Sequence, residues 1–269
     1  MLVDAHAHVW GSELLDVHWL RADAAAGIRR PFGVEQLERE LGRAGIDRVV
    51  LVAADETDAG NLRLLDVASR SPRVGAVVAW ADPADARVGE KVALMRDAAG
   101  GERLRGVRLS ADGAGAAWWW SREVIAGLAA LRDLGLVIEV LTDEGSLPAL
   151  AAVGRGVAGL TLVVDHLGAL PAEGREQWTA GIRELAAVEG AHLKVSGAPV
   201  FADDFAEMLG AARRAFGASR LMAGSDWPVS TLHGGDAWRR VVDAASGWSD
   251  DERANLTGRT AARVYGIAA

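Results

Sequence analysis

Eight short runs of mostly apolar residues recur along the chain, and longer segments with helical periodicity separate them. The predicted strands cover Leu2–Val9, Arg48–Ala53, Val74–Trp80, Leu104–Leu109, Leu136–Leu141, Thr161–Leu167, His192–Ser196 and Arg220–Ser225. The predicted helices cover Val34–Ala44, Asn61–Ser69, Ala86–Ala98, Ser121–Leu134, Ser146–Val153, Arg175–Val188, Asp203–Phe216 and Asp236–Ala245. Strict alternation of strand and helix predicts an α/β protein with a parallel sheet. Eight such units in about 250 residues are the size expected of a closed (β/α)8 TIM barrel.

The start of the chain favours the barrel over the competing fold, an open doubly wound sheet. A doubly wound sheet usually carries a glycine-rich phosphate-binding turn after its first strand. This chain has His6-Ala-His8 there instead. No linker, repeat or low-complexity segment divides the sequence, so we expect residues 1–269 to form a single domain. The segment 249–269 is expected to form two closing helices, with Tyr265 and Ile267 as packing anchors.

The composition excludes several classes of function. The 269 residues include no cysteine, which excludes disulfides, cysteine-ligated zinc and a thiol nucleophile. The net charge of -8 argues against a nucleic-acid partner, because no basic stripe is present to neutralise phosphates. No apolar run reaches the length of a membrane span, and no basic leader precedes the first strand. We therefore expect a cytoplasmic protein that acts on a small molecule, with its oligomeric state left open.

The first strand carries a pair of histidines that could share a metal ion. Side chains alternate along a strand, so His6 and His8 are expected to point the same way, side by side. Two imidazoles at that spacing can each give one ring nitrogen to a divalent ion. The pair is a weak signal by itself, since two histidines in a strand are more often ordinary polar positions.

Other ionisable residues lie where buried strands are expected to end, which is where barrel enzymes build their active sites. His166 and Asp226 each follow a long apolar run, Arg108 ends the fourth strand, and Glu139 lies in the fifth. Burying such groups without a partner is costly, so a charged or ionisable side chain there must be paired or bound. Their convergence with the two histidines on one barrel mouth predicts a metal or catalytic site.

Each of these residues also has a structural interpretation. Asp226 could cap a short helix beginning near Pro228, and His166 could be a core histidine bonded to a loop carbonyl. Arg108 could form an interior ion pair with Glu139, which we weigh equally against binding of a substrate anion.

The remaining ionisable candidates are expected to play smaller roles. Asp165 should face the helices, because it alternates with His166. Asp4 should face the same way as the strand-one histidines but deeper, in an orienting or packing role. The loop histidines His18 and His233 could touch substrate, although a solvated position is the safer expectation.

Tryptophans gather near the predicted mouth of the barrel. Four of them follow predicted strands, namely Trp10, Trp19, Trp80 and Trp227. The run Trp118–Trp120 lies in the loop after strand four, and three adjacent tryptophans cannot all face one core on a helix. Together with Arg108, Trp10, Trp19, Trp80, Trp118 and Trp227 are the candidate substrate-binding residues, because aromatic walls suit a flat or ring-shaped ligand.

Three sequence blocks resemble the amidohydrolase superfamily. They are Asp4-Ala-His-Ala-His-Val-Trp10, Val163-Val-Asp-His-Leu-Gly168 and Leu221-Met-Ala-Gly-Ser-Asp-Trp-Pro-Val229. More narrowly, the chain resembles the amidohydrolase-2 group of sugar-lactone and dicarboxylate lactone hydrolases. The resemblance runs nearly from end to end, through Val195-Ser-Gly197 and the closing Ala261-Ala-Arg-Val-Tyr-Gly266.

The resemblance implies a TIM-barrel hydrolase that opens a lactone, from a sugar acid or from aromatic degradation, to a hydroxy acid. His6, His8, His166 and Asp226 would form the shared site. Asp226 would take a proton from the attacking water and return it to the departing alcohol. A metal held by His6 and His8, or His166 and Arg108 without a metal, would stabilise the oxyanion.

The chain departs from the family pattern in ways that limit the metal site. Many superfamily members bridge two metals with a carboxylated lysine, but no lysine ends strand four, five or six. Strand five offers Glu139 where other branches have a histidine. We therefore expect one divalent ion, best matched by zinc, with His6, His8, Glu139 and Asp226 as ligands, and metal-independent catalysis as the alternative.

Other activities of the same superfamily compete with lactone hydrolysis. A non-oxidative decarboxylase would need a metal and a bound substrate carboxylate, which Arg108 would suit. An amide hydrolase could use the same activated water on a C–N bond. A non-catalytic binding barrel is disfavoured, because it would have little reason to keep these four site residues together.

Overall fold

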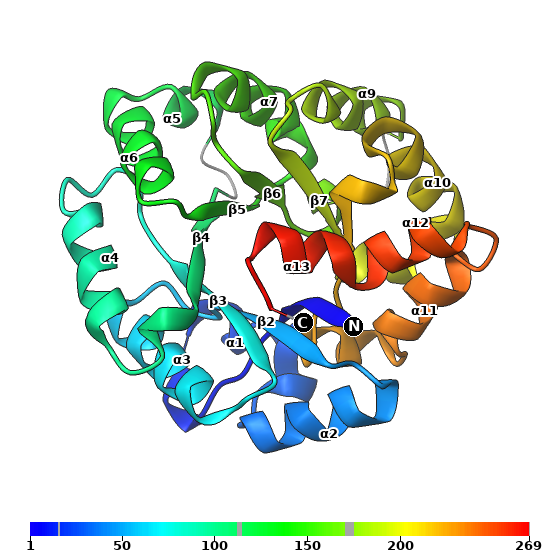
Figure 1. Cartoon of the computed structure of the whole chain (residues 1–269), viewed down its shortest axis with the longest axis horizontal. Coiled ribbons are helices and arrows are strands. Elements are labelled where there is room, and N and C mark those ends of the chain that lie inside the picture. The colour runs from blue at the N-terminus through cyan, green and yellow to red at the C-terminus, as the bar shows by residue number, and fades with distance from the viewer. Residues whose placement is uncertain (16, 112–114, 170–174, 269) are drawn as a thin grey trace.

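A computed structural model describes residues 1–15, 17–111, 115–169 and 175–268. In them, eight parallel strands form one sheet in chain order. The strands are β1 (Val3–Ala7), β2 (Arg48–Val52), β3 (Val74–Trp80), β4 (Leu104–Ser110), β5 (Val137–Leu141), β6 (Leu162–Val164), β7 (Ala191–Val195) and β8 (Leu221–Ala223). The sheet curls into a central barrel with helices around it (Figure 1), which confirms the predicted (β/α)8 fold.

Helices cover the outside of the barrel between successive strands. The longer ones are α2 (Val34–Ala44), α3 (Asp58–Arg70), α4 (Val88–Asp97), α6 (Arg122–Asp133), α7 (Leu147–Gly156), α9 (Arg175–Ala186), α10 (Phe205–Phe216) and α11 (Ala237–Ala244). All eight coincide with predicted helices to within a few residues. In α2, Leu37 and Leu41 are four residues apart and both are buried, because this spacing places them on one helix face. No helix of the described residues is long and apolar enough to cross a membrane.

Strand alternation divides the apolar side chains into two layers. One set points into the barrel and includes Val3, Ala5, Val50, Val52, Ala76 and Val78. The other set points outward and packs against the helices, as Leu51 and Val77 do. Both layers are almost completely buried. The charged residues inside the barrel are therefore held within a closely packed frame.

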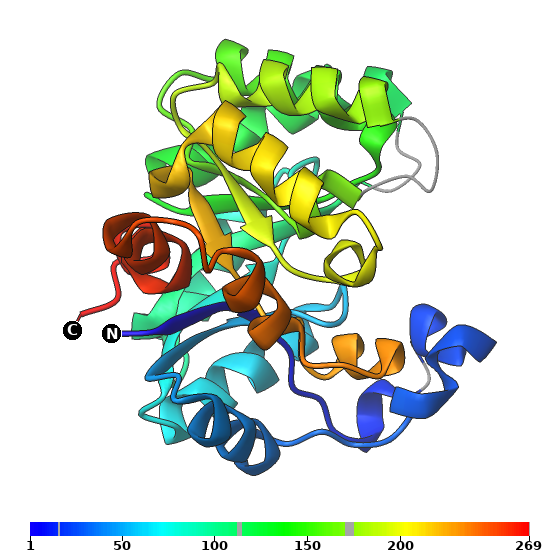
Figure 2. The same ribbon diagram turned by 90° about the vertical axis from the view of Figure 1, so that its right-hand side faces the viewer.

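The C-terminal segment closes one end of the barrel. Helices α12 (Asp250–Ala254) and α13 (Thr260–Val264) pass across this end, where both chain termini also lie, while the segment after β1 projects at the opposite end (Figure 2). Tyr265 and Ile267 belong to the inner core, so their predicted role as packing anchors is confirmed. Ala269, the last residue of the predicted closing segment, lies outside the described residues.

The first and last strands meet at a junction just beyond their C-terminal ends. The His8 backbone N–H donates to the Trp227 carbonyl at 2.7 Å, and the Asp226 N–H donates to the His6 carbonyl at 2.8 Å. Asp4 precedes these residues in β1, and its Oδ1 accepts from the N–H groups of Ser225 and His6 at 2.9 and 3.1 Å. We call these contacts the β1–β8 junction.

The position of Asp4 differs from the sequence expectation. The pairing of β1 with β2 shifts register between Asp4 and Ala7, so regular alternation does not continue through this strand. Val3 and Ala5 point into the barrel, and Asp4 lies outside it, beside Leu37 and Leu41 of α2. Asp4 therefore does not share a face with the two histidines; it supports them through the backbone.

Candidate functional site

Three donor atoms converge at the C-terminal end of the barrel, where β1 meets β8. His6 Nε2 lies 3.1 Å from His8 Nε2, and Asp226 Oδ1 lies 3.7 Å from the first nitrogen and 3.5 Å from the second. All three side chains are buried. The histidine pair and the strand-eight aspartate, which are 218 or more positions apart in the sequence, are therefore brought together by closure of the barrel.

These three atoms fit a single tetrahedral ion. Bonds of about 2.1 Å to a zinc ion place neighbouring ligand atoms about 3.4 Å apart, close to the separations given above. The hydrogen bonding of His8 also suits ligation. Its Nδ1 lies 2.8 Å from the Val52 carbonyl oxygen, which can only accept, so Nδ1 carries the proton and Nε2 keeps its lone pair. His6, His8 and Asp226 are thus one set of residues that could hold a divalent metal.

His6 is placed between two partners that make opposite demands on its ring. Its Nδ1 lies 3.2 Å from Lys194 Nζ and 3.3 Å from Asp165 Oδ1. The ammonium only donates, so it requires a lone pair on Nδ1, whereas the carboxylate only accepts and requires an N–H. If Nδ1 carries the proton and donates to Asp165, the lone pair on Nε2 is free for a metal. If Nδ1 instead accepts from Lys194, the proton is on Nε2, which can donate to His8.

Burial and neighbouring charges set the ionisation of the site. Burial lowers the pKa of His8, and burial together with the Lys194 charge lowers the pKa of His6 well below its usual value. Burial alone would raise the pKa of Asp226, but the nearby histidines, first among them His166, outweigh it and bring the pKa to about 2. At neutral pH the site therefore holds neutral imidazoles and an ionised carboxylate, which are the forms that bind metals.

His166 and Asp226 both occupy unusual backbone positions. Their φ angles are 52° and 53°, in the left-handed region that costs a non-glycine residue about 1–3 kcal/mol and that is often found at functional sites. His166 begins the short element α8 (His166–Ala169), its Nδ1 lies 2.9 Å from Ser196 Oγ, and its ring centroid lies 4.6 Å from that of His6. The Asp226 side chain faces the histidines and caps no helix.

The left-handed turn at His166 also explains why our expectation for Asp165 is wrong. Strand β6 ends at Val164, and Asp165 follows on the same face as Val163, which points into the barrel. Asp165 is therefore inside, 3.3 Å from both His6 Nδ1 and Lys194 Nζ. The turn then redirects His166 toward the mouth, so simple alternation between these two residues does not hold.

Arg108 and Glu139 do not form the ion pair that was weighed from the sequence. Arg108 donates to the Ala53 carbonyl at 2.6 Å and approaches Asp165 at 4.0 Å. Glu139 pairs with Lys194 at 2.6 Å and accepts a further hydrogen bond from the Tyr265 hydroxyl. Glu139 groups with His6 and Asp165 in a deeper cluster, apart from the expected ligands His8 and Asp226.

A cavity of about 820 Å³ opens onto two of the three converging side chains, His8 and Asp226. His8, Arg108, His166 and Asp226 are at its base. Its walls include Trp19 and Trp80, two of the predicted substrate-binding residues, as well as His18, His233, Asp55 and Glu56. Trp19 is fixed by a hydrogen bond from its indole N–H to the Ala54 carbonyl, at 2.8 Å. The size suits a small ring-shaped molecule.

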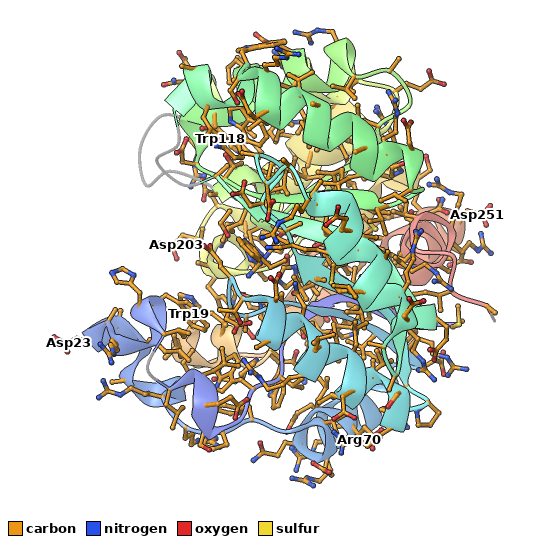
Figure 3. All side chains as sticks on the ribbon, turned by 90° about the vertical axis from the view of Figure 1, so that its left-hand side faces the viewer. Trp19, Asp23, Arg70, Trp118, Asp203 and Asp251 are labelled. Atoms are coloured by element: carbon orange, nitrogen blue, oxygen red, sulfur yellow. The ribbon has the colours of Figure 1, made fainter. Side chains whose placement is uncertain are left out.

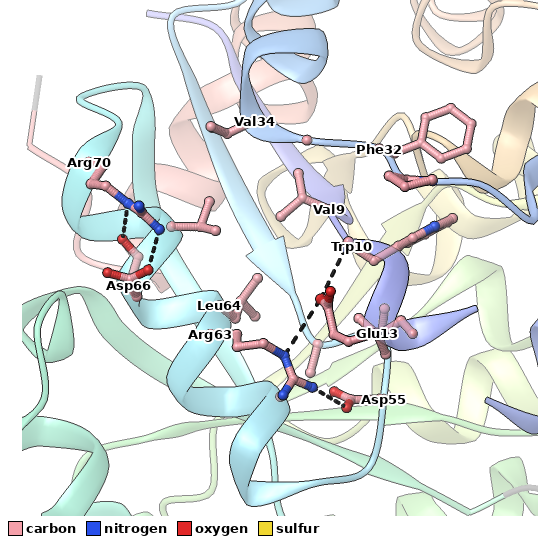
Figure 4. Close-up of a pocket in the computed structure, with 18 of the residues that line it drawn as sticks. Val9, Trp10, Glu13, Phe32, Val34, Asp55, Arg63, Leu64, Asp66 and Arg70 are labelled. Atoms are coloured by element: carbon pink, nitrogen blue, oxygen red, sulfur yellow. Dashed lines mark hydrogen bonds and ion pairs between the residues drawn. The ribbon is translucent and has the colours of Figure 1, made fainter. Parts of the chain in front are cut away.

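The other three predicted substrate-binding tryptophans lie outside this lining. Trp10 packs against Phe32, at 5.4 Å between ring centroids, and lines a separate cavity of about 530 Å³ beside the Glu13–Arg63–Asp55 ion pairs (Figure 4). Trp227 also packs against Phe32. Trp118 lies at the same end of the barrel as Trp19 (Figure 3), where its ring contacts Trp119.

Two important residues were missed from the sequence. Lys194, in β7, is completely buried among the site residues, and Tyr265 contributes a hydroxyl as well as apolar packing. A signal for Lys194 was available, because the chain has only two lysines and this one interrupts an apolar strand. A buried ammonium requires negatively charged partners, although the sequence does not say which.

Comparisons with known proteins agree with this geometry. The family model described as amidohydrolase matches residues 3–267. The L-fucono-1,5-lactonase of Burkholderia ambifaria is 36% identical, covering 98% of this chain and 95% of the relative. The one from Burkholderia multivorans is 30% identical, covering 98% and 96%. A crystal structure of a B. multivorans amidohydrolase with bound zinc superposes with a TM-score of 0.91 at 30% identity, over 100% of both chains. The resemblance seen in the sequence blocks is confirmed, and this chain belongs to the amidohydrolase family.

Proposed function

We propose that this protein is a lactonase that opens a sugar-acid lactone to its hydroxy acid. The observation that carries the proposal is the convergence of His6, His8 and Asp226, of which His8 and Asp226 line a cavity large enough for a sugar ring. The two L-fucono-1,5-lactonases that match almost the whole chain support the same substrate class.

The charges around the cavity favour a neutral lactone over a dicarboxylate or an aryl carboxylate. Arg108 is the cationic side chain at the base, and its guanidinium already donates to the Ala53 carbonyl. Glu56 lines the wall and would repel an anionic substrate, whereas the neighbouring Asp55 already pairs with Arg63. Carboxylates are also suitable partners for the hydroxyl groups of a sugar. These features favour sugar-lactone hydrolysis over the decarboxylase alternative.

The proposed metal site consists of His6, His8 and Asp226, with zinc as the ion. Three protein ligands with one open position are typical of catalytic zinc, and the zinc-bound relative supports this choice. When bound, the ion would polarise the lactone carbonyl and lower the pKa of a bound water.

The residues of the chain then have distinct roles in the reaction. The ionised Asp226 takes a proton from the attacking water as its oxygen bonds to the carbonyl carbon. His166, fixed by Ser196, and Arg108 stabilise the negative charge that develops on the carbonyl oxygen. As the ring C–O bond breaks, Asp226 returns the proton to the departing ring oxygen, which gives the hydroxy acid. Trp19 and Trp80 hold the sugar ring over these groups.

A pH-indicator assay with L-fucono-1,5-lactone and related sugar lactones tests the proposal. Asp226→Asn is expected to lower kcat by about 10²- to 10⁴-fold, because the amide cannot take a proton from water. Asp203→Asn, an exposed aspartate, is the control and should leave kcat unchanged. Turnover of no lactone in the panel, or full activity of Asp226→Asn, would contradict the proposed function. Undiminished activity after a strong chelator has removed all metal would contradict the zinc assignment alone.

A further inference from the structure

A second group of charged side chains lies inside the barrel, between the catalytic residues and Tyr265. Lys194, Glu139 and Asp165 are at most 1% exposed. Lys194 Nζ lies 2.6 Å from Glu139 Oε2, 3.3 Å from Asp165 Oδ1 and 3.2 Å from His6 Nδ1. The Tyr265 hydroxyl donates to the other oxygen of Glu139. A single ammonium is thus in contact with all three neighbours.

Those three neighbours could themselves hold a metal ion. One ligand atom each from His6, Glu139 and Asp165 lie within 4.8 Å of one another, and all three residues are buried. Neither carboxylate oxygen of Asp165 has a hydrogen-bond partner among the described residues. An imidazole nitrogen with two carboxylates is a donor set that zinc and similar divalent ions accept.

A cation is required in this cluster on electrostatic grounds. Two buried carboxylates are costly unless a positive charge compensates them, and breaking a buried pair by removing one partner is strongly destabilising. The ammonium is the positive charge nearest to both carboxylates.

We propose that Lys194 is a built-in cation that takes the place of a metal ion in this deeper cluster. Because the ammonium is attached to the chain, it cannot dissociate. It therefore keeps a divalent ion away from the carboxylates of Glu139 and Asp165. The protein is thereby restricted to the metal position beside Asp226. The restriction to one metal position rests on the proposed function of the site formed by His6, His8 and Asp226. The proposal that Lys194 takes the place of a metal ion does not depend on that function.

Metal counting on purified protein tests the exchange. Wild type, Lys194→Ala, Lys194→Met and Lys91→Ala are incubated with zinc, freed of unbound ion and examined by elemental analysis. Lys194→Ala is expected to bind one more zinc per chain than wild type, because alanine leaves the ligands and the space. With both ions bound, His6 would bridge them as an imidazolate, its ring proton released to solvent. Lys194→Met fills the space without charge and should gain none. Lys91 is the matched control, since it also joins two carboxylates, Asp58 and Asp85, but at the surface.

The difference between variant and wild type decides the outcome. Equal zinc content in Lys194→Ala and wild type would overturn the proposal. A wild type that binds no zinc would contradict the metal part of the proposed function, yet a gain of one ion in Lys194→Ala would still support the exchange.

Refolding provides a second measurement if Lys194→Ala is recovered only as insoluble protein. The denatured variant is refolded with and without zinc, and circular dichroism and thermal melting report the folded fraction. Native signal that returns only with zinc supports the proposal. Failure in both conditions overturns it, because a divalent ion would then be unable to replace the ammonium. Wild type and Lys91→Ala should refold equally well in either condition.

Discussion

Replacing Asp4 by alanine is expected to weaken the β1–β8 junction. Asp4 is 1% exposed, and its Oδ1 accepts from the backbone N–H groups of Ser225 and His6. Burial raises the pKa of Asp4 to about 6 against the hydrogen bonds from Ser225 and His6, so the carboxylate is mostly ionised above neutral pH. Alanine leaves two buried N–H groups without an acceptor, each costing about 1–3 kcal/mol. The free energy of unfolding should fall by about 2–6 kcal/mol.

The same substitution should reduce catalysis, because the two N–H groups belong to His6 itself and to the residue before Asp226. A displacement of about 1 Å at a reacting group can cost about 100-fold in rate. We expect Asp4→Ala to lose kcat/KM on that scale, and Asp4→Asn, which keeps an acceptor oxygen, to lose much less.

Urea denaturation and lactone hydrolysis at one pH measure both effects. Asp47→Ala is the matched control, because exposed Asp47 accepts from the Leu2 N–H at 2.8 Å, just before β1 begins. This control should change stability by less than about 1 kcal/mol. If Asp4→Ala is as stable and active as Asp47→Ala, the junction does not depend on the carboxylate and our reasoning is refuted.

Two further predictions concern pH and substrate binding. Burial lowers the pKa of His192 to about 4, against 6.5 for an unfolded histidine, so stability should fall by up to about 3 kcal/mol as the pH drops from 6.5 to 4. Chemical denaturation across this pH range should show a larger loss of unfolding free energy in wild type than in His192→Leu. If the unfolding free energies of the two proteins change in parallel with pH, the prediction is wrong. Trp80→Ala should raise KM for the lactone about tenfold, because contact with the sugar ring is lost. Trp118 lies outside the cavity lining, so Trp118→Ala should leave KM unchanged. Equal KM values for the two variants in kinetic assays would remove Trp80 from the proposed site.

Most of the fold could be predicted from sequence periodicity. The eight strands are buried on both faces and therefore form continuous apolar runs, while the helices expose one face and show a spacing of three and four. The strand ends could be located because polar residues begin where the apolar runs end. This is why the histidine pair, His166 and Asp226 were recognised as facing one mouth.

The errors came from local departures from regular geometry and from long-range pairing. Alternation fails at Asp4 because β1 shifts register, and at Asp165 because the next residue turns left-handed. Neither feature leaves a clear mark in the residue types. The partners of Lys194 come from β1, β5 and the end of β6, and only the barrel brings them together. The tryptophans were expected to line the mouth, but which of them do so is decided by loop conformation.

The location of the proposed metal ligands at the β1–β8 junction has a consequence for how the protein matures. His6 and His8 are synthesised before Asp226, which follows more than two hundred positions later. A partly folded chain, or one that ends before β8, can have most of its strands in place and still lack the complete ligand set. Catalytic activity therefore requires the first and last strands to meet, and binding of the proposed zinc ion should favour that closed state over open intermediates.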